Sequence, residues 1–448
     1  MDPRLAARGI YFPLTKLAGQ PVGRYLDEYR ARDSWTSDRL YAFQRECLKK
    51  LLSTAATRCS FYRARWTELP DWPQSAELLS LTNLPSLSRN DVLESEAGIR
   101  VAGPVGRVVR KTSGGSTGRP VTIIKSADAL ARERAATWRG YGWAGIDVAA
   151  PQARLWGVPI SRKGRLVAAL LDKLGNRVRL SAFGFTEESI ASFVARIHRF
   201  KPHFIYGYVS LIVELCRFLE ATQGRLPGSV KCVITTAEVL DEQARSYIHD
   251  VTQLRAYNEY GCGEVGSIAH ECDAGQLHIM ADNLIVEEEV GNDLPSGLCH
   301  LLVTDLHNLA MPLIRYRLGD LGSLSRTTCP CGKPYPVLAK IVGRAYDVIV
   351  GSGGKRYHPE AVLYAFEELK REGVTLPPFQ VVQSRDGELC VRLTESEVVN
   401  ASVRQRLVAL LKASLGDDLS VEFDFAQAIE REPSGKLRVV KRLTASSS

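Results

Sequence analysis

The fold of this chain is decided by the stretch Thr112-Ser113-Gly114-Gly115-Ser116-Thr117-Gly118-Arg119-Pro120. Its glycines let the backbone come close to a polyphosphate, and its hydroxyl groups and exposed amides supply hydrogen-bond donors. Residues 121–124, Val-Thr-Ile-Ile, predict a strand after the loop, whereas a Walker A loop needs Gly-Lys-Ser/Thr leading into a helix. We therefore expect a phosphate-binding loop of another kind, with a plain Gly/Ser hairpin loop as the alternative.

The composition is that of an ordinary globular protein. The chain has 448 residues, of which 45% are hydrophobic and 24% charged, and this length predicts more than one domain. The net charge of +8 is mild for this length, so it suits small anionic substrates and does not indicate nucleic acid. The first residues lack the pattern of a secretory signal, and no run reaches the roughly 20 apolar residues of a membrane span. We expect a cytoplasmic protein with no nucleic-acid or membrane partner.

Ten cysteines in a cytoplasmic chain do not predict a disulfide framework. Six of them stand singly among apolar residues and are interpreted as small core residues: Cys47, Cys59, Cys216, Cys232, Cys299 and Cys390.

The first two thirds of the chain alternate helical patterns with short β-branched runs. Such a succession predicts an α/β sheet with helical crossovers. The segments expected from it are helices at 37–58, 186–200 and 210–220 and strands at 203–206 and 231–235.

The pattern of predicted helices and strands changes twice further along the chain. A β-rich stretch, with strands expected at 284–290, 300–305 and 313–316, precedes a small α+β unit. In that unit the sequence predicts a helix at 359–372, a hairpin at 380–394, a helix at 396–415 and a strand at 419–425. The predicted division is an N-terminal domain over 1–345, with a β-rich subdomain at about 281–340, and a C-terminal lid over 346–448.

Four further motifs follow the glycine-rich loop in a fixed order. They are Asn-Glu-Tyr-Gly-Cys-Gly-Glu at 258–264, Tyr-Arg-Leu-Gly-Asp at 316–320, Gly-Arg-Ala-Tyr-Asp at 343–347 and Pro-Ser-Gly-Lys at 433–436. Together they resemble the adenylate-forming superfamily of acyl- and aryl-CoA synthetases. Ala237-Glu238 and Cys329-Pro330-Cys331-Gly332 narrow the resemblance to the phenylacetate-CoA ligase branch and its CapK-like members. Two positions depart from the common pattern, since Gly263 replaces a Thr and Tyr346 replaces an Asp or Lys.

The resemblance implies an enzyme that uses ATP and Mg²⁺ to convert a carboxylate into an acyl-adenylate. The acyl group then passes to a thiol, most simply CoA, with an aromatic or related organic acid as the substrate. Delivery to an amine is the second enzymatic alternative. The implied fold is α/β, with a large N-terminal domain and a mobile C-terminal lid, and the resemblance is compatible with a homodimer.

Residue roles follow from the same resemblance. Lys436 is expected to bridge the carboxylate and the α-phosphate, Glu264 to bind Mg²⁺, and Arg344 to touch the ribose or set the domain angle. The residues expected to bind the nucleotide are Thr112, Ser113, Gly114, Gly115, Ser116, Thr117, Gly118, Ala237, Glu238, Tyr257, Asn258, Glu259, Tyr260, Asp320 and Arg344. Those expected around the acyl group are Trp156, Tyr206, Gly207, Tyr208 and Gly261, and a plain core role is the alternative for the aromatic ones.

A structural zinc ion is the last expectation. Zinc takes four Cys or His ligands, although a C-x-C clip is tighter than the usual C-x₂₋₄-C. Members of the branch carry a structural zinc, and the matching residues are Cys272, His278, Cys329 and Cys331, with His270 in reserve. A zinc-clip binding protein without catalysis would explain this set alone, but it leaves the loop, Glu264, Asp320 and Lys436 unexplained.

Overall fold

The computed structural model describes most of the chain. The described residues are 2, 5, 7–66, 81–112, 121–157, 162–181, 186–291, 294, 297–342, 349–351, 355–357, 360–374, 376–377, 379–394, 398–427, 429 and 439–443. The glycine-rich loop from Ser113 to Pro120, Arg344 and Lys436 lie outside them.

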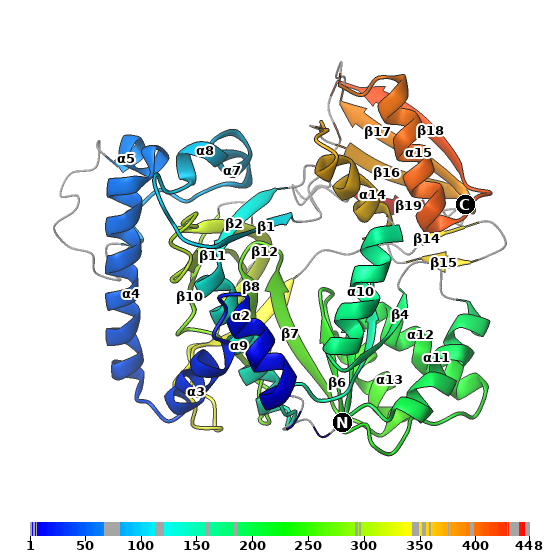
Figure 1. Cartoon of the computed structure of the whole chain (residues 1–448), viewed down its shortest axis with the longest axis horizontal. Coiled ribbons are helices and arrows are strands. Elements are labelled where there is room, and N and C mark those ends of the chain that lie inside the picture. Colours follow the sequence, from blue (N-terminus) through cyan, green and yellow to red (C-terminus); the bar gives the residue numbers. More distant parts are fainter. Residues whose placement is uncertain are drawn as a thin grey trace.

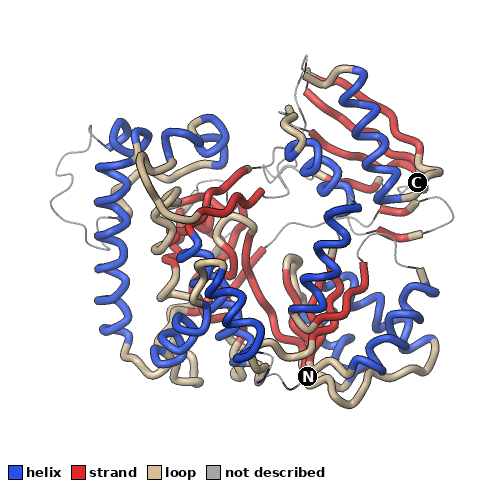
Figure 2. Tube along the Cα trace, viewed as in Figure 1, coloured by secondary structure: helices blue, strands red, loops and turns tan. Residues whose placement is uncertain are grey.

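One mixed sheet of eleven strands forms the body of the molecule (Figures 1 and 2). Its strand order is β10-β11-β12-β13-β9-β8-β7-β6-β5-β3-β4. The five strands from β4 to β7 are parallel, and all the pairs from β7 to β10 are antiparallel. The parallel strands are β3 (Gln152–Trp156), β4 (Arg177–Ser181), β5 (Phe204–Tyr208), β6 (Cys232–Thr236) and β7 (Ala256–Cys262). The antiparallel ones are β8 (Gly266–Glu271), β9 (Leu277–Ile279), β10 (Leu284–Glu289), β11 (Cys299–Asp305), β12 (Tyr316–Leu324) and β13 (Val337–Val342).

Helices connect the strands of the parallel half of the sheet, as the alternating sequence pattern predicts. Its crossover helices are α10 (Arg162–Leu174), α11 (Glu187–Phe200), α12 (Val209–Ala221) and α13 (Glu242–Thr252). Thr186 caps α11 through a capping box, and the buried stripe Ile190, Phe193 and Ile197 fixes its inner face. The predicted α/β class is therefore confirmed.

A hairpin and a long helix sit against the other half of the sheet. The hairpin joins β1 (Val108–Thr112) to β2 (Thr122–Ser126), so it carries the glycine-rich loop at its tip and confirms the strand expected after that loop. Helix α9 (Ala127–Trp143) follows, packs along α3 and contacts β8. The remaining N-terminal elements are η1 (Ala7–Tyr11), α2 (Phe12–Leu17), α3 (Val22–Arg32), α4 (Ser37–Arg58), α5 (Ser60–Trp66), α7 (Arg89–Glu94) and α8 (Glu96–Ile99).

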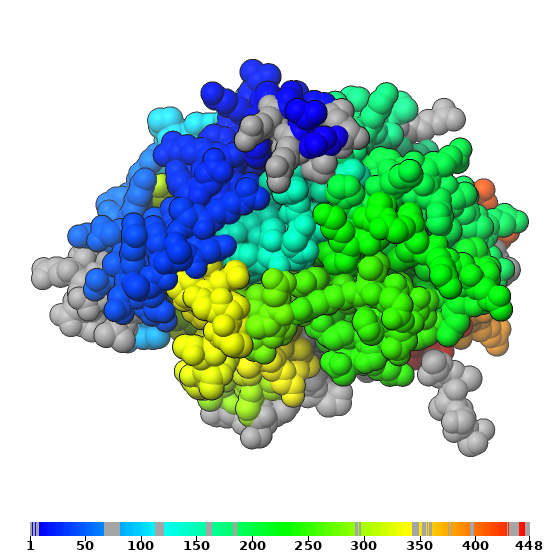
Figure 3. All heavy atoms as spheres, turned by 90° about the horizontal axis from the view of Figure 1, so that it is seen from below, coloured from blue at the N-terminus to red at the C-terminus, as the bar shows by residue number. Residues whose placement is uncertain are grey.

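Segments far apart in the sequence lie side by side in this body. The space-filling view shows the N-terminal helices (blue) against the segment near residue 335 (yellow) (Figure 3). Tyr335 donates its hydroxyl hydrogen to Asp33 over 3.0 Å, and Arg139 forms a buried two-point ion pair with Asp282 at 2.8 Å. These contacts tie α3 and α9 to the loops that connect the antiparallel strands.

The C-terminal residues form a smaller unit with its own core (Figure 1). Its four-stranded sheet has the order β18-β17-β16-β19, and a two-stranded ribbon of β14 and β15 precedes it. The elements are β14 (Ile349–Val350), β15 (Arg356–Tyr357), α14 (Glu360–Arg371), β16 (Phe379–Arg385), β17 (Glu388–Thr394), α15 (Ala401–Leu415), β18 (Ser420–Ala426) and β19 (Val440–Arg442). The predicted boundary at residue 345 falls among residues that are not described and stays a prediction.

Two predicted segments need correction. No strand covers 313–316: β12 begins only at Tyr316, because Arg315 has a left-handed backbone (φ 51°) that interrupts the extended chain. The helix expected at 396–415 begins at Ala401, where the Asn400 side chain accepts a hydrogen bond from the amide of Val403.

All ten cysteines lie in the described part of the chain, and all are free thiols. Cys59, Cys216 and Cys232 are buried as predicted, whereas Cys47, Cys299 and Cys390 are half-buried. In the described ranges no helix combines the length and apolarity that a membrane crossing requires.

Candidate active site and metal centre

A cleft of about 1250 Å³ opens at the carboxyl ends of the parallel strands and reaches the C-terminal unit. Residues at the ends of β3, β5, β6 and β7 line it, as expected for ligand sites in sheets of this type. Eleven of the residues singled out in the sequence are among its lining: Thr112, Trp156, Tyr206, Ala237, Glu238, Asn258, Glu259, Tyr260, Gly261, Glu264 and Asp320.

Three others are not part of that lining. Tyr208 is fully buried and stacks on Trp156 with ring centroids 4.4 Å apart, while Gly207 leaves no room for a side chain because Leu155 O would lie 2.6 Å from its Cβ. Tyr257 donates to Asp273 over 3.0 Å under the guanidinium of Arg255. Of the two tyrosines expected to bind the nucleotide, Tyr257 and Tyr260, only Tyr260 is therefore part of the described cleft surface.

Glu264 is held in a defined orientation at the cleft. Its Oε1 accepts a hydrogen bond from Arg89 Nη1 at 2.7 Å and another from the Tyr316 hydroxyl at 3.4 Å. The carboxylate is only 6% exposed, so this charge-assisted contact is stronger than a surface pair. The sequence analysis missed Arg89, which lies 175 residues before Glu264 and belongs to no motif.

Asp320 also has a partner from another strand. The Tyr260 hydroxyl on β7 donates to its Oδ2 over 2.9 Å, which joins the 258–264 and 316–320 motifs in one place.

Glu238 is held by another element: its carboxylate accepts hydrogen bonds from the amide and the hydroxyl of Ser210, in the first turn of α12. Ala237 beside it has φ 66°, a left-handed conformation that is rare for a residue with a side chain.

A network of buried charges supports the base of the hairpin. Lys125 is 1% exposed, and its Nζ lies 2.7 Å from Glu133 and 3.2 Å from Asp305. Lys111 meets the other oxygen of Glu133 at 2.7 Å. Burial alone raises the pKa of Glu133, but the adjacent charges of Lys125 and Lys111 outweigh it and lower the pKa to about 2. The two strands that carry the glycine-rich loop are thus fastened to α9.

Glu259 occupies the inner wall of the cleft. Its two oxygens accept hydrogen bonds from Ser267 at 2.7 Å and from Tyr141 at 3.1 Å, and His270 Nε2 lies 3.7 Å away. Burial lowers the pKa of His270, so the imidazole is neutral near pH 7. His270, the reserve zinc ligand, therefore belongs to this cluster on the inner wall.

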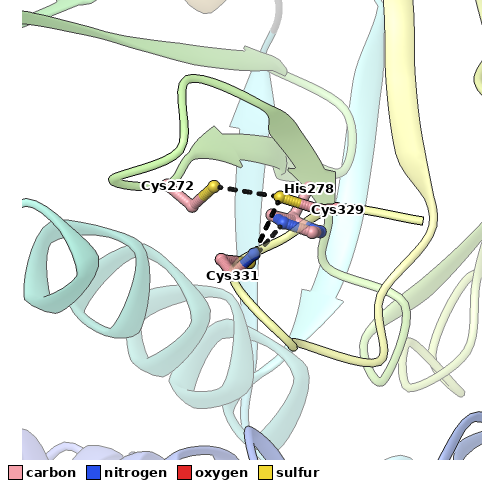
Figure 4. A group of neighbouring side chains, drawn as sticks. All are labelled: Cys272, His278, Cys329 and Cys331. Atoms are coloured by element: carbon pink, nitrogen blue, oxygen red, sulfur yellow. Dashed lines mark hydrogen bonds between the residues drawn. The ribbon is translucent and has the colours of Figure 1, made fainter. Parts of the chain in front are cut away.

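The four predicted zinc ligands come together at the turn between β8 and β9 (Figure 4). The ligand atoms of Cys272, His278, Cys329 and Cys331 all lie within 4.8 Å of one another. Cys272 Sγ is 3.7 Å from Cys329 Sγ, and His278 Nε2 is 3.1 Å from Cys331 Sγ. A tetrahedron with bonds of about 2.3 Å has edges of about 3.8 Å, so this spacing fits zinc.

The ring of His278 is oriented by its other nitrogen. Nδ1 lies 3.0 Å from the carbonyl oxygen of Tyr335, which accepts its hydrogen and leaves Nε2 facing the thiols. Trp143, the last residue of α9, packs edge-on against the same ring. A zinc ion bound by all three thiols and the imidazole would have no open position for a substrate, as in structural sites.

Comparisons with known proteins agree with this architecture. Residues 349–443 match the family model of the CapK C-terminal domain. The phenylacetate-coenzyme A ligase of Thermus thermophilus is 27% identical over 90% of this chain and 96% of its own, and Protein CapK of Staphylococcus aureus is 21% identical over 80% and 79%. The solved structure of 2-hydroxyisobutyryl-CoA ligase in complex with 2-HIB-AMP and CoA superposes with a TM-score of 0.57 at 20% identity, covering 92% of this chain and 91% of that one.

The architecture and these matches support an adenylate-forming protein. Within that class, they support a protein of the CapK-like, phenylacetate-CoA ligase type, as the order of the motifs predicts.

Proposed function

We propose that this chain is an AMP-forming acid–CoA ligase. The observation that carries the proposal is the cleft, which gathers residues from the loop hairpin, from the 258–264 and 316–320 motifs and from the ends of four parallel strands. Two of the three relatives named above, the phenylacetate-coenzyme A ligase and the 2-hydroxyisobutyryl-CoA ligase, are acid–CoA ligases by name, and their matches cover 90% and 92% of this chain.

Two displacements make up the proposed reaction. A carboxylate oxygen of the acid attacks the α-phosphorus of ATP, the bond to pyrophosphate breaks, and an acyl-adenylate forms. The sulfur of CoA then attacks the acyl carbon, the bond to AMP breaks, and the thiol proton leaves to solvent. Catalysis of such transfers is mostly positioning and electrostatic stabilisation.

The residues of the cleft have matching proposed tasks. Asp320 accepts hydrogen bonds from the ribose hydroxyls and is oriented by Tyr260, while the loop from Ser113 to Gly118 holds the phosphates. Lys436 bridges the carboxylate and the α-phosphate, and Arg344 touches the ribose. Tyr206 and Trp156 form walls of the acyl pocket.

The carboxylate of Glu264 fits a magnesium ion, because Mg²⁺ takes carboxylate and phosphate oxygens. When bound, the ion neutralises phosphate charge. Arg89 contributes by fixing the orientation of the carboxylate before nucleotide binds.

We further propose that the four-ligand cluster holds a structural zinc ion. The change Cys331→Ser removes one thiolate, so metal analysis should find zinc near one equivalent in the wild-type protein and well below that in the variant. Cys299→Ser, at a half-buried thiol outside the cluster, is the matched control and should keep its zinc. Equal zinc contents in the two variants would contradict the assignment.

The function is tested by pyrophosphate release with ATP and Mg²⁺ against a panel of aryl, aliphatic and amino acids, with and without CoA. Release that depends on both an acid and CoA supports the ligase. Release that depends on an acid but is unaffected by CoA favours delivery to an amine or a carrier thiol. Absence of release with every acid overturns the proposal.

A further inference from the structure

The inner part of the cleft contains an arginine that lies beside two stacked aromatic rings. Arg154 lies on β3, and its guanidinium carbon is 4.8 Å from the ring centroid of Trp156 and 4.9 Å from that of Tyr206. Arg154 is the register partner of Tyr206 on β5, so the two side chains project from the same face of the sheet. All three residues line the cleft.

The charge of Arg154 is not balanced by the described part of the chain. No described carboxylate lies within 4.0 Å of its guanidinium, and its buried Nε has no hydrogen-bond partner there. Glu259, the acid on the same wall, accepts hydrogen bonds from Ser267 and Tyr141 and lies more than 4.0 Å from the guanidinium of Arg154.

A second guanidinium increases this positive charge. Arg177 on the neighbouring strand β4 also lines the cleft, and burial together with the charge of Arg154 lowers the pKa of Arg177 to about 10. The carboxylate near Arg177 is Asp172, which forms a two-point ion pair with Arg179 at 2.7 and 2.8 Å. Asp172 is thus shared by Arg177 and Arg179, and this part of the cleft keeps a net positive charge.

Arg154 is half-buried and its Nε is fully buried. Removing a guanidinium even partly from water without an anion is unfavourable, and stacking on aromatic rings offsets only part of that cost. A residue of this kind is stabilised when a ligand supplies the missing anion. Arginine suits that role because its planar fork binds a carboxylate through two parallel hydrogen bonds.

The position of Arg154 fits the far end of an acyl group. Arg154, Tyr206 and Ile234 are paired in register, two residues before the strand ends at Trp156, Tyr208 and Thr236. Two residues along a strand span about 6.6 Å. Ala237, which begins the loop of the proposed nucleotide site, follows directly after Thr236. The Cα of Arg154 therefore lies about that far below the level at which the nucleotide loop begins, and its guanidinium reaches the ring of Trp156 at the strand end.

We propose that the acid activated by this protein carries a second carboxylate, and that Arg154 recognises it beside the stacked rings of Trp156 and Tyr206. The inference rests on the proposed ligase function and specifies the substrate class of the same site as a dicarboxylic acid with a flat or short body.

The experiment compares acids in matched pairs that differ only in the second carboxylate: benzoate with terephthalate, phenylacetate with 4-carboxyphenylacetate, and butyrate with glutarate. Acid-dependent ATP–pyrophosphate exchange gives kcat/KM for each acid with the wild-type protein and with Arg154→Gln. A hydrogen-bonded charge pair contributes about 1.5–3 kcal/mol, so we expect a preference of roughly 10- to 150-fold for the diacid of at least one pair. That preference should fall toward unity in Arg154→Gln.

Two further variants sharpen the result. Arg154→Glu should invert the preference, favouring 4-(aminomethyl)benzoate over terephthalate. Arg217→Gln removes an exposed arginine of α12 that pairs with Glu214 and should behave like the wild-type protein. A diacid preference that survives in Arg154→Gln, or equal use of mono- and diacids by the wild-type protein, would overturn the inference and leave the ligase function standing.

Calorimetric titration with the same diacids tests the anion site at Arg154 separately from the proposed ligase function. If no acid supports exchange, the proposed function fails. Diacid binding that disappears in Arg154→Gln would then still support the anion site, and no binding to the wild-type protein would overturn that site as well.

Discussion

Two positive charges in this molecule have different surroundings. Lys125, buried on strand β2 of the hairpin, lies within 3.2 Å of two carboxylates, Glu133 and Asp305. Arg154, half-buried on the inner wall of the cleft, has aromatic neighbours and no described acid within ion-pair distance. Only Lys125 therefore forms ion pairs within the described chain.

The difference separates structural from functional use of buried charge. A cation that is neutralised by its own chain fixes the geometry of the elements that carry it, here β1, β2 and α9. A cation without such a partner is stabilised only when a ligand arrives, so its contribution is expected in binding. Four experiments on three substitutions test this distinction, from the largest expected effect to the smallest.

Glu133→Gln should be the most damaging substitution, because it removes the carboxylate that both Lys125 and Lys111 contact and leaves Lys125 with Asp305 alone. Removing one partner of a buried ion pair destabilises a protein by about 3–5 kcal/mol, and denaturant unfolding should show a loss of that order. The double change Glu133→Gln with Lys125→Met removes one of the excess positive charges and should recover part of the loss. If the double variant is no more stable than the single one, the excess positive charge is not the cause.

The loss of stability at low pH should depend on the same residue, Glu133. The pKa of Glu133 is about 2 in the folded protein and near 4.5 otherwise, so the unfolded chain binds the proton first as the pH falls. The stabilisation is therefore complete above pH 4.5 and is lost between about pH 4.5 and 2, to a total of about 3 kcal/mol. Unfolding measured across this window should lose less stability in Glu133→Gln than in the wild-type protein, and parallel curves for the two proteins would contradict the assignment.

Tyr260→Phe tests a polar pair at the cleft itself. Loss of its hydrogen bond to Asp320 leaves the carboxylate less well oriented for the ribose, at about 1 kcal/mol. Steady-state kinetics should show KM for ATP rising about fivefold with kcat nearly unchanged. Tyr257→Phe, outside the described cleft surface, is the control. The same rise in both variants would show that the effect is not specific to Asp320.

Arg154→Gln should have the smallest effect on stability. No described ion pair is lost, so we expect the free energy of unfolding to change by less than about 0.5 kcal/mol while substrate discrimination changes. A loss of several kcal/mol would place Arg154 with Lys125 as a structural charge.

Local patterns predicted much of this fold. The apolar stripes of α4 and α11, the β-branched run of β6 and the Asp386-Gly387 turn between β16 and β17 are all encoded within a few residues. The strand expected at 313–316 was wrong because the left-handed backbone of Arg315 depends on its surroundings: its amide donates to Thr304 and its side chain contacts Glu287.

The cleft residues that belong to contiguous sequence motifs were predicted, and those outside any motif were missed. The residues of 258–264 and 316–320 were found because they form short runs, and the four metal-binding candidates because Cys and His are rare in this chain. Arg89, Glu133 and Arg154 belong to no run, and their importance arises only when the sheet brings them beside Glu264, Lys125 and Tyr206. Such long-range pairing is not visible in a single sequence.

The central claim is that this cleft activates a carboxylate with ATP. It is tested most directly by carboxylate-dependent ATP–pyrophosphate exchange in the wild-type protein and in Lys436→Ala, with circular dichroism as the check on folding. Removing a charge that stabilises the transition state costs about 100- to 1,000-fold. The account predicts acid-dependent exchange in the wild-type protein and a loss of that size in a folded variant. Unchanged exchange in Lys436→Ala would contradict it.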